Sequence, residues 1–186
     1  MESKILYFET PGIANTDATL RIARERAEAL GIKQIIVASS HGYTAKRAVA
    51  IFDGLDVDII AVTLSASFTD LGWPITPEER AELEALGVIV LTSLHSLGDD
   101  VSDAFEAYPP NKIVRETLYR FCQGMKVAVE VALMAADADL LDMSQEIIAI
   151  AGTGEGADTA IVLKPAYARK FKKIEIREIL AKPREA

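Results

Sequence analysis

The sequence predicts an α/β fold: one three-layer α/β/α domain over residues 1–186, with a mostly parallel, mixed sheet at its centre. Two observations predict it. Short apolar runs alternate with longer segments in which apolar residues recur at helical spacing. Several of the runs, such as residues 59–62, are apolar on both faces, which is typical of parallel strands covered by helices on both sides.

Seven apolar runs are candidate strands, at residues 5–8, 34–38, 59–62, 88–91, 146–151, 159–163 and 174–179. A helical pattern follows the first run; we expect Asn15 or Thr16 to cap this helix and Gly31 to end it. A second helical pattern begins near Ala45, directly after the second run. Strands and helices thus alternate, as right-handed crossover connections require.

Two further stretches carry strong helix signals. Thr76, followed three positions later by Glu79, predicts a capping box at a helix start. Residues 112–136 form a long helical stretch, with Gly124 as the point where two helices would meet. Residues 127–136 are apolar nearly all round, so we expect them to be buried against the sheet or a partner subunit. Because monomers rarely expose large apolar patches, we predict a homo-oligomer, most simply a two-fold dimer.

The composition narrows the class of ligand. A formal charge of −8 without a long basic stripe makes nucleic acid and anionic membranes poor partners. No apolar run approaches the roughly 20 residues that span a bilayer, and the first run is too short for a signal peptide. Cys122 is the one cysteine, which excludes an internal disulfide and a cysteine-rich metal site. We therefore expect a cytoplasmic protein that binds a small molecule.

A polar stretch, residues 39–45 (Ser-Ser-His-Gly-Tyr-Thr-Ala), joins the second candidate strand to its helix. Backbone N–H groups at a helix start point outward, and the helix dipole favours an anion in front of them. Ser39, Ser40 and Thr44 add hydroxyl groups, and Gly42 lets the backbone approach a ligand closely. The stretch is a candidate phosphate cradle. The alternative is a strand-to-helix turn whose hydroxyls only cap the helix.

A glycine-rich loop, residues 152–158, lies between two apolar runs. The simpler interpretation is a tight connection between strands. The alternative is a second wall of the ligand pocket, because glycines let the backbone approach a ligand closely. His41 and His95 are the only histidines, and either one would serve as an acid or base if it faced the crevice. We predict no metal, because two histidines are too few for a zinc site without carboxylate help. Asp99, Asp100 and Asp103 form a small acidic cluster, which is more typical of a solvated helix start than of a metal site.

Residues 34–63 resemble the C-terminal domain of pyruvate kinase. In that domain a strand, a Ser/Thr-Gly-x-Ser/Thr-Ala turn and a helix hold the phosphate of an allosteric sugar. Four residues match the turn, with one residue inserted between the first two: Ser40, Gly42, Thr44 and Ala45, with His41 inserted. The loop at 152–156 resembles the second effector loop of that domain. A catalytic TIM barrel needs about 250 residues by itself, so we expect no pyruvate kinase activity.

The whole chain is similar to a family of stand-alone archaeal and bacterial proteins that resemble this domain. The shared stretches are residues 15–16, 39–45, 123–130, 134–138, 152–160 and 164–166. The resemblance implies a five-stranded central sheet and flavin mononucleotide (FMN) as the cofactor. The candidate cofactor-binding residues are Asn15, Thr16, Ser39, Ser40, His41, Gly42, Tyr43, Thr44, Thr63, His95, Gly152, Thr153, Gly154, Gly156, Asp158 and Thr159.

Three functions compete. Four donors to a phosphate contribute roughly 1.5–3 kcal/mol each, against an association cost of about 4–15 kcal/mol. Useful affinity therefore needs an apolar ring on the ligand as well, which favours a module that binds FMN. The second function is a flavin-dependent oxidoreductase with His95 or Tyr43 as proton donor. The third is a regulatory subunit that senses a sugar phosphate. No spaced Ser, His and Asp set marks a hydrolase, so catalytic residues stay unassigned.

Overall fold

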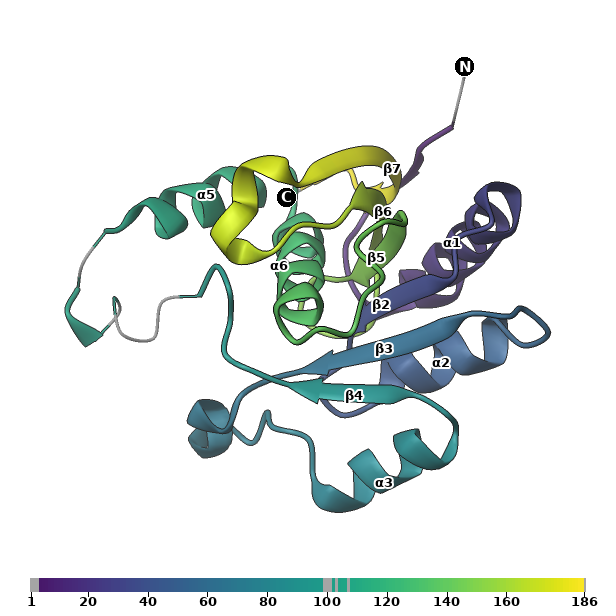
Figure 1. Cartoon of the computed structure of the whole chain (residues 1–186), viewed down its shortest axis with the longest axis horizontal. Coiled ribbons are helices and arrows are strands. Elements are labelled where there is room, and N and C mark those ends of the chain that lie inside the picture. Colours follow the sequence, from purple (N-terminus) through teal and green to yellow (C-terminus); the bar gives the residue numbers. More distant parts are fainter. Residues whose placement is uncertain (1–3, 99–101, 103, 107, 186) are drawn as a thin grey trace.

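The computed structural model describes residues 4–98, 102, 104–106 and 108–185. These residues form a seven-stranded sheet in the order β1-β7-β6-β5-β2-β3-β4 (Figure 1). The strands are β1 (Leu6–Phe8), β2 (Gln34–Ala38), β3 (Asp58–Thr63), β4 (Ile89–Thr92), β5 (Ile147–Ala151), β6 (Thr159–Lys164) and β7 (Glu175–Pro183). Of these strands, only β6 runs antiparallel to its neighbours.

The α/β fold and the mixed, mostly parallel sheet are confirmed. The five strands implied by the resemblance are wrong, because all seven apolar runs pair into one sheet. β7 pairs along β6 and in turn offers its other edge to β1, which pairs with it in parallel. The sheet therefore continues for two strands beyond β6.

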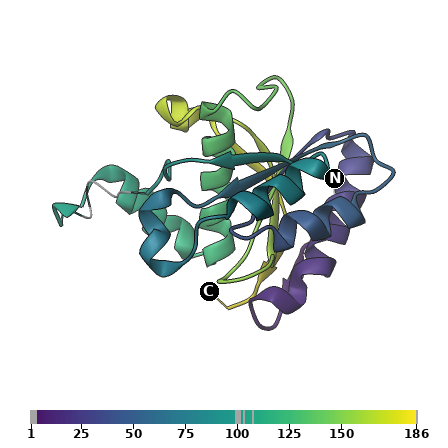
Figure 2. The same cartoon turned by 90° about the horizontal axis from the view of Figure 1, so that it is seen from below.

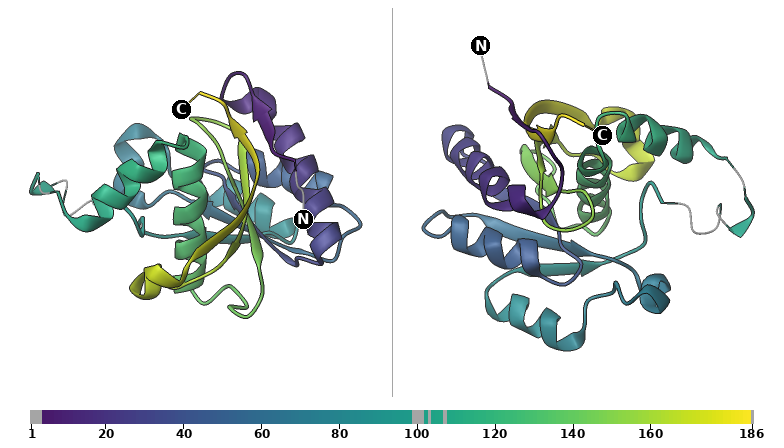
Figure 3. Two further views of the ribbon diagram at one scale, coloured as in Figure 1. Left: turned by 90° about the horizontal axis from the view of Figure 1, so that it is seen from above. Right: turned by 180° about the vertical axis from the view of Figure 1, so that it is seen from behind.

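Helices cover both faces of the sheet, as Figure 2 and the left view of Figure 3 show. On one face α1 (Thr16–Leu30) contacts β5, β6 and β7, α2 (Tyr43–Ile51) contacts β2 and β3, and α3 (Pro77–Ala85) contacts β4. On the other face α6 (Gln123–Asp137) contacts β5, β2 and β6, and α5 (Pro110–Tyr119) contacts α6. Among the residues described, short 3-10 turns lie in the connections, namely η1 (Ile13–Asn15), η2 (Ala66–Leu71) and η3 (Ala168–Lys173).

The central strands are buried on both faces. In β2, Ile36 belongs to the apolar cluster under α6, whereas its neighbours Ile35 and Val37 belong to the cluster under α1 and α2. Side chains of a strand alternate between faces, so a strand between two helix layers must be apolar at every position. This alternation explains why the strands appear in the sequence as continuous apolar runs.

α6 is covered within the chain itself. It is buried from Gly124 to Ala136 apart from Val127, which is partly buried. Leu118 of α5 and Phe171 of η3 pack on the same cluster, on the side of α6 away from the sheet. The expectation that part of this helix needs a partner subunit is therefore wrong, because α5 and η3 supply the cover. The dimer remains a prediction, without support from α6.

The boundary between α5 and α6 falls before Gly124, at residues 120–122. Cys122 caps α6, and its Sγ accepts a hydrogen bond from the backbone N–H of Met125 at 3.3 Å. Gly124 lies in the first turn, where a Cβ atom would stand 2.2 Å from Oγ1 of Thr159. The glycine thus allows α6 to approach β6, rather than dividing the helix. In the part of the chain that the structure describes, no helix is both long and apolar enough to cross a membrane.

Candidate functional site

The carboxyl ends of β2 and β5 lie side by side in the middle of the sheet. α2, which follows β2, packs on one face of the sheet, whereas α6, which precedes β5, packs on the other. The connections therefore switch from one face to the other between these two strands. In open α/β sheets, ligands bind in the crevice at such a switch point. The two loops singled out in the sequence follow these two strands, residues 39–42 after β2 and residues 152–158 after β5.

The start of α2 keeps open hydrogen-bond donors. Gly42, in a left-handed conformation with φ 85°, precedes the helix, and Oγ of Ser39 accepts the N–H of Ala45 at 3.2 Å. Among the described residues, the N–H groups of Tyr43 and Thr44 have no protein acceptor. Thr44 is only 3% exposed as a residue, and its hydroxyl has no partner among the described residues, yet that oxygen still touches solvent. Such a helix start can accept an anion.

Asp158 organises the glycine loop. Its side chain is fully buried, and Oδ2 accepts the N–H of Gly12 at 2.9 Å and that of Thr153 at 3.0 Å. Oδ1 accepts the hydroxyl of Thr159 at 2.8 Å, which in turn lies 3.3 Å from Sγ of Cys122. Three donors satisfy the buried carboxylate, which desolvation would otherwise penalise. Asp158 therefore joins the loop after β1, the glycine loop and the start of α6.

Thr16 makes a second connection between these loops. Its hydroxyl donates to the carbonyl of Ile13 at 2.7 Å and accepts the N–H of Ala157 at 3.0 Å. Asn15 donates its side-chain amide to the carbonyl of Thr10 at 2.8 Å. Asn15 stands at the N-cap position of α1, as expected, but its side chain makes no capping hydrogen bond, because its amide donates to Thr10 instead. Gly156, with φ 72°, lets the glycine loop dock here.

Thr63 closes the carboxyl end of β3. Its hydroxyl lies 2.6 Å from that of Thr92 at the end of β4. Arg80 of α3 donates to Oγ1 of Thr92 at 2.6 Å and to the carbonyl of Val90 at 2.9 Å. This part of the candidate site ties β3, β4 and α3 together.

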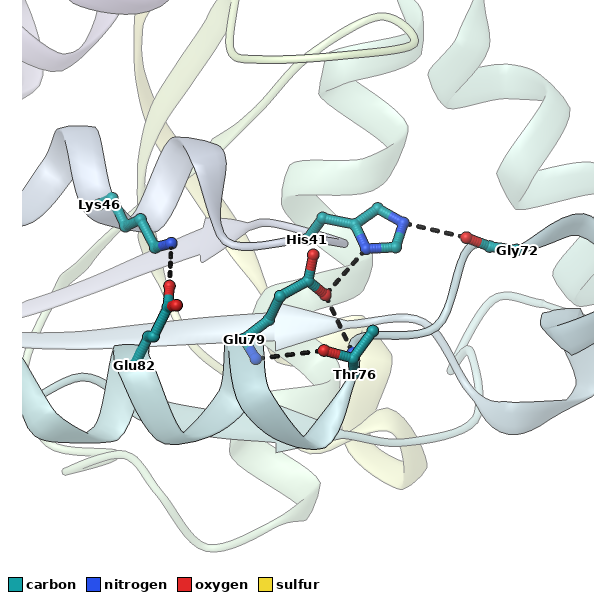
Figure 4. A network of polar contacts seen from close by, with 6 residues as sticks. All are labelled: His41, Lys46, Gly72, Thr76, Glu79 and Glu82. Carbon is teal, nitrogen blue, oxygen red and sulfur yellow. Dashed lines mark hydrogen bonds and ion pairs between the residues drawn. The ribbon is translucent and has the colours of Figure 1, made fainter.

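The His41 ring points toward α3 and the loop before it (Figure 4). Its Nδ1 lies 3.0 Å from Oε2 of Glu79, and its Nε2 lies 3.0 Å from the carbonyl oxygen of Gly72. The predicted capping box is confirmed: Oγ1 of Thr76 accepts the N–H of Glu79, and Glu79 accepts the N–H of Thr76 at 2.9 Å. The Glu79 carboxylate raises the pKa of His41. The pKa of Glu79 is lowered, mainly by the hydrogen bond from the N–H of Thr76 and next by the hydrogen bond with His41.

An aromatic pair lies on the loop between β3 and α3. The rings of Phe68 and Trp73 stack with centroids 5.6 Å apart, and the ring of His95 lies 5.5 Å from that of Phe68. Trp73 is 47% exposed, and Leu94, next to His95, is exposed as well. Trp73 thus packs the loop with one face and offers an apolar surface with the remainder.

A buried ion pair holds the loop that carries His95. Lys126 and Glu130, one turn apart on α6, are 6% and 2% exposed and pair with each other. The second oxygen of Glu130 accepts the N–H of Leu97 at 3.0 Å. α6 therefore positions the connection after β4 as well as covering the sheet.

The structure thus divides the predicted site residues into groups. The first group joins the loop after β1 to the glycine loop and comprises Asn15, Thr16, Gly152, Thr153, Gly154, Gly156, Asp158 and Thr159. The second lies at the start of α2 and comprises Ser39, Ser40, Gly42, Tyr43 and Thr44. Thr63, His41 and His95 each contact other elements, and the acidic cluster Asp99, Asp100 and Asp103 lies outside the described residues. Sequence reasoning missed the shared roles of Glu79 and Glu130, because no local pattern reveals which distant loop a carboxylate meets.

Comparison with known proteins identifies the domain. The family model of the pyruvate kinase alpha/beta domain matches residues 17–163, more than half of the chain. The chain belongs to this family. Among solved structures it resembles two pyruvate kinases from Cryptosporidium parvum, one of them in complex with ADP. The first is 18% identical over 81% of this chain, with a TM-score of 0.39, and the second 16% identical over 83%, with a TM-score of 0.41. The chain spans 23% of the length of each enzyme.

Proposed function

We propose that this pyruvate kinase alpha/beta domain binds a phosphorylated, ring-bearing ligand, FMN, at the switch point between β2 and β5. The observation that carries the proposal is the start of α2. There the N–H groups of Tyr43 and Thr44 and the nearly buried Thr44 hydroxyl have no partner among the described residues. A phosphate would accept hydrogen bonds from all three donors and would face the positive end of the helix dipole.

The residues present suit FMN. The phosphate would meet the α2 start, with the hydroxyl of Ser40 beside it in sequence. The ring would have an apolar surface in the exposed part of Trp73, whose loop is joined to residue 41 through Gly72. When bound, FMN supplies a ring that accepts and donates electrons; the chain itself supplies hydrogen-bond donors and an apolar surface. If FMN binds, the protein could also act as a flavin-dependent oxidoreductase, with His95 or Tyr43 as proton donor.

A second candidate is a regulatory module that senses a sugar phosphate, because Ser40, Gly42, Thr44 and Ala45 resemble the turn that holds a sugar phosphate in the C-terminal domain of pyruvate kinase. The same cradle would hold its phosphate, but a sugar offers no aromatic ring to Trp73. Ribose 5-phosphate therefore tests this alternative. Binding of FMN well above binding of ribose 5-phosphate supports the flavin, and the reverse order supports the sugar phosphate.

The cradle is tested by removing its hydroxyls. We expect Ser40→Ala with Thr44→Ala to weaken FMN binding by about 2–4 kcal/mol, measured by calorimetric titration, because two donors to a charged phosphate are lost. Thr117→Ala is the control, since that exposed hydroxyl on α5 only donates to the carbonyl of Ile113. Equal affinity of the double variant and the control for FMN would show that the phosphate lies elsewhere.

A further inference from the structure

We infer that His41 is a proton-operated clasp. In its protonated form the ring holds the loop between β3 and α3 against the start of α2, and in its neutral form it keeps only one of its two contacts, which loosens that loop. The inference concerns regulation of the site proposed above, but it is tested without any ligand. Its failure would therefore leave the FMN proposal standing, and failure of FMN to bind would leave the clasp standing.

The geometry requires two protons on the ring. Nδ1 faces the Glu79 carboxylate and Nε2 faces the Gly72 carbonyl, both at 3.0 Å. A carboxylate and a carbonyl are acceptors only, and neutral imidazole carries a single N–H. Only imidazolium can donate to both partners at once. Loss of the proton therefore breaks one of the two contacts and leaves two acceptor atoms facing each other.

The charges around His41 favour the protonated ring. Glu79 faces it from α3, and next to this pair Lys46 of α2 bonds to Glu82 of α3 at 2.5 Å (Figure 4). Lys46 and His41 also help to lower the pKa of Glu79, so the carboxylate stays charged in mild acid. The pKa of His41 is raised, with Glu79 as the main cause and the Gly72 carbonyl as a smaller one.

The direction of the pH dependence follows from these two shifts. Stability from His41 is fully present below the ordinary histidine pKa of about 6.5 and is lost as the pH rises through the raised value. Stability from Glu79 is present above its ordinary pKa of about 4.3 and is lost as the pH falls through the lowered value. The clasp is therefore closed between these limits and opens on the alkaline side.

The clasp connects the cradle to the aromatic pair. His41 lies directly before Gly42 at the start of α2, and Gly72 lies directly before Trp73. The connecting loop carries Phe68 as well, stacked on Trp73. One proton at His41 thus sets how firmly the loop that carries this aromatic pair is joined to the start of α2. Ligand binding would then weaken as the pH rises past the pKa of His41.

The chain offers two clean probes of this clasp, because it contains two histidines and a single tryptophan. NMR titration of the ligand-free protein gives the pKa of each histidine ring, assigned with His95→Gln. Trp73 fluorescence reports on the loop over the same pH range. We expect the pKa of His41 to exceed 6.5, the ordinary histidine value, and the Trp73 emission to change with the same midpoint.

Two neighbouring carboxylates provide matched variants. Glu79→Gln keeps a side chain that can complete the capping box but removes the charge, so the midpoint should fall toward about 6.5. Glu82→Gln removes a charge one turn away that does not touch His41, and the midpoint should stay in place. His41→Gln should abolish the transition, and His95→Gln should keep its midpoint. An ordinary pKa for His41 in the wild-type chain, or Trp73 emission that ignores the titration of His41, overturns the clasp.

Discussion

Gly154 and Gly156 differ only in their surroundings. They stand two positions apart in the glycine loop with φ values of 71° and 72°. A Cβ at Gly154 would meet nothing within 4 Å, whereas one at Gly156 would lie 2.4 Å from Oγ1 of Thr16 and 2.7 Å from Cα of Ile13. The first glycine serves the turn alone; the second also lets the loop dock on the start of α1.

This difference predicts unequal costs of alanine. Gly154→Ala should lower the free energy of unfolding by about 1–2 kcal/mol, the cost of a left-handed residue with a Cβ. Gly156→Ala should cost roughly 1–3 kcal/mol more, because the new methyl group overpacks a tight contact. Urea denaturation of both variants measures the difference. Similar losses would show that the loop can shift away from α1 at little cost and make room for the methyl group.

At the scale of elements, α6 positions loops as well as covering the sheet. Lys126 and Glu130 are buried together, and Glu130 also holds the N–H of Leu97. Glu130→Ala should lower the free energy of unfolding by about 3–5 kcal/mol, because it leaves Lys126 buried without its partner. The exposed pair of Lys33 and Asp56 is the control, and Asp56→Asn should cost less than about 1 kcal/mol. Equal effects of the two substitutions in urea denaturation would contradict a structural role for the buried pair.

Elements set by local sequence were predictable. The strands follow from continuous apolar runs, and the capping box of α3 follows from Thr76 and Glu79 three positions apart. The boundary of α6 was not predictable, because a cysteine at its start and a glycine in its first turn are weak local signals. The burial of α6 depends on η3, which follows β6 and packs on α6. Such a contact between distant segments is visible only in the folded chain.

The same limit applies to the site. Local sequence indicated the α2 start and the glycine loop, since glycines and hydroxyls between apolar runs are visible in any window. It did not reveal that Asp158 binds the N–H of Gly12, 146 positions away, or that His41 meets Glu79. Long-range polar contacts between loops depend on strand order: β1-β7-β6-β5 brings Gly12 to Asp158, and β2-β3-β4 brings His41 to Glu79, only after folding.

At the scale of the molecule, association remains a prediction. α6 no longer requires it, but Phe105, Tyr108 and Ile113, in and before α5, expose large apolar side chains. Such a group favours contact with a second copy. Light scattering at micromolar concentration should give about twice the 20.2 kDa of one chain. A mass of one chain, unchanged on concentration, would contradict the dimer.

The switch point between β2 and β5 is the proposed site for the phosphate of a ring-bearing ligand. The most direct test compares FMN with riboflavin, which carries the same ring without the phosphate, by calorimetric titration of the wild-type chain and the Ser40→Ala, Thr44→Ala variant. We expect FMN to bind the wild-type chain more tightly than riboflavin by about 2–4 kcal/mol, and the variant to lose most of this difference, apart from the share of the backbone N–H groups, while binding riboflavin unchanged. Equal affinity of the wild-type chain for FMN and riboflavin, or no binding of either, would contradict it.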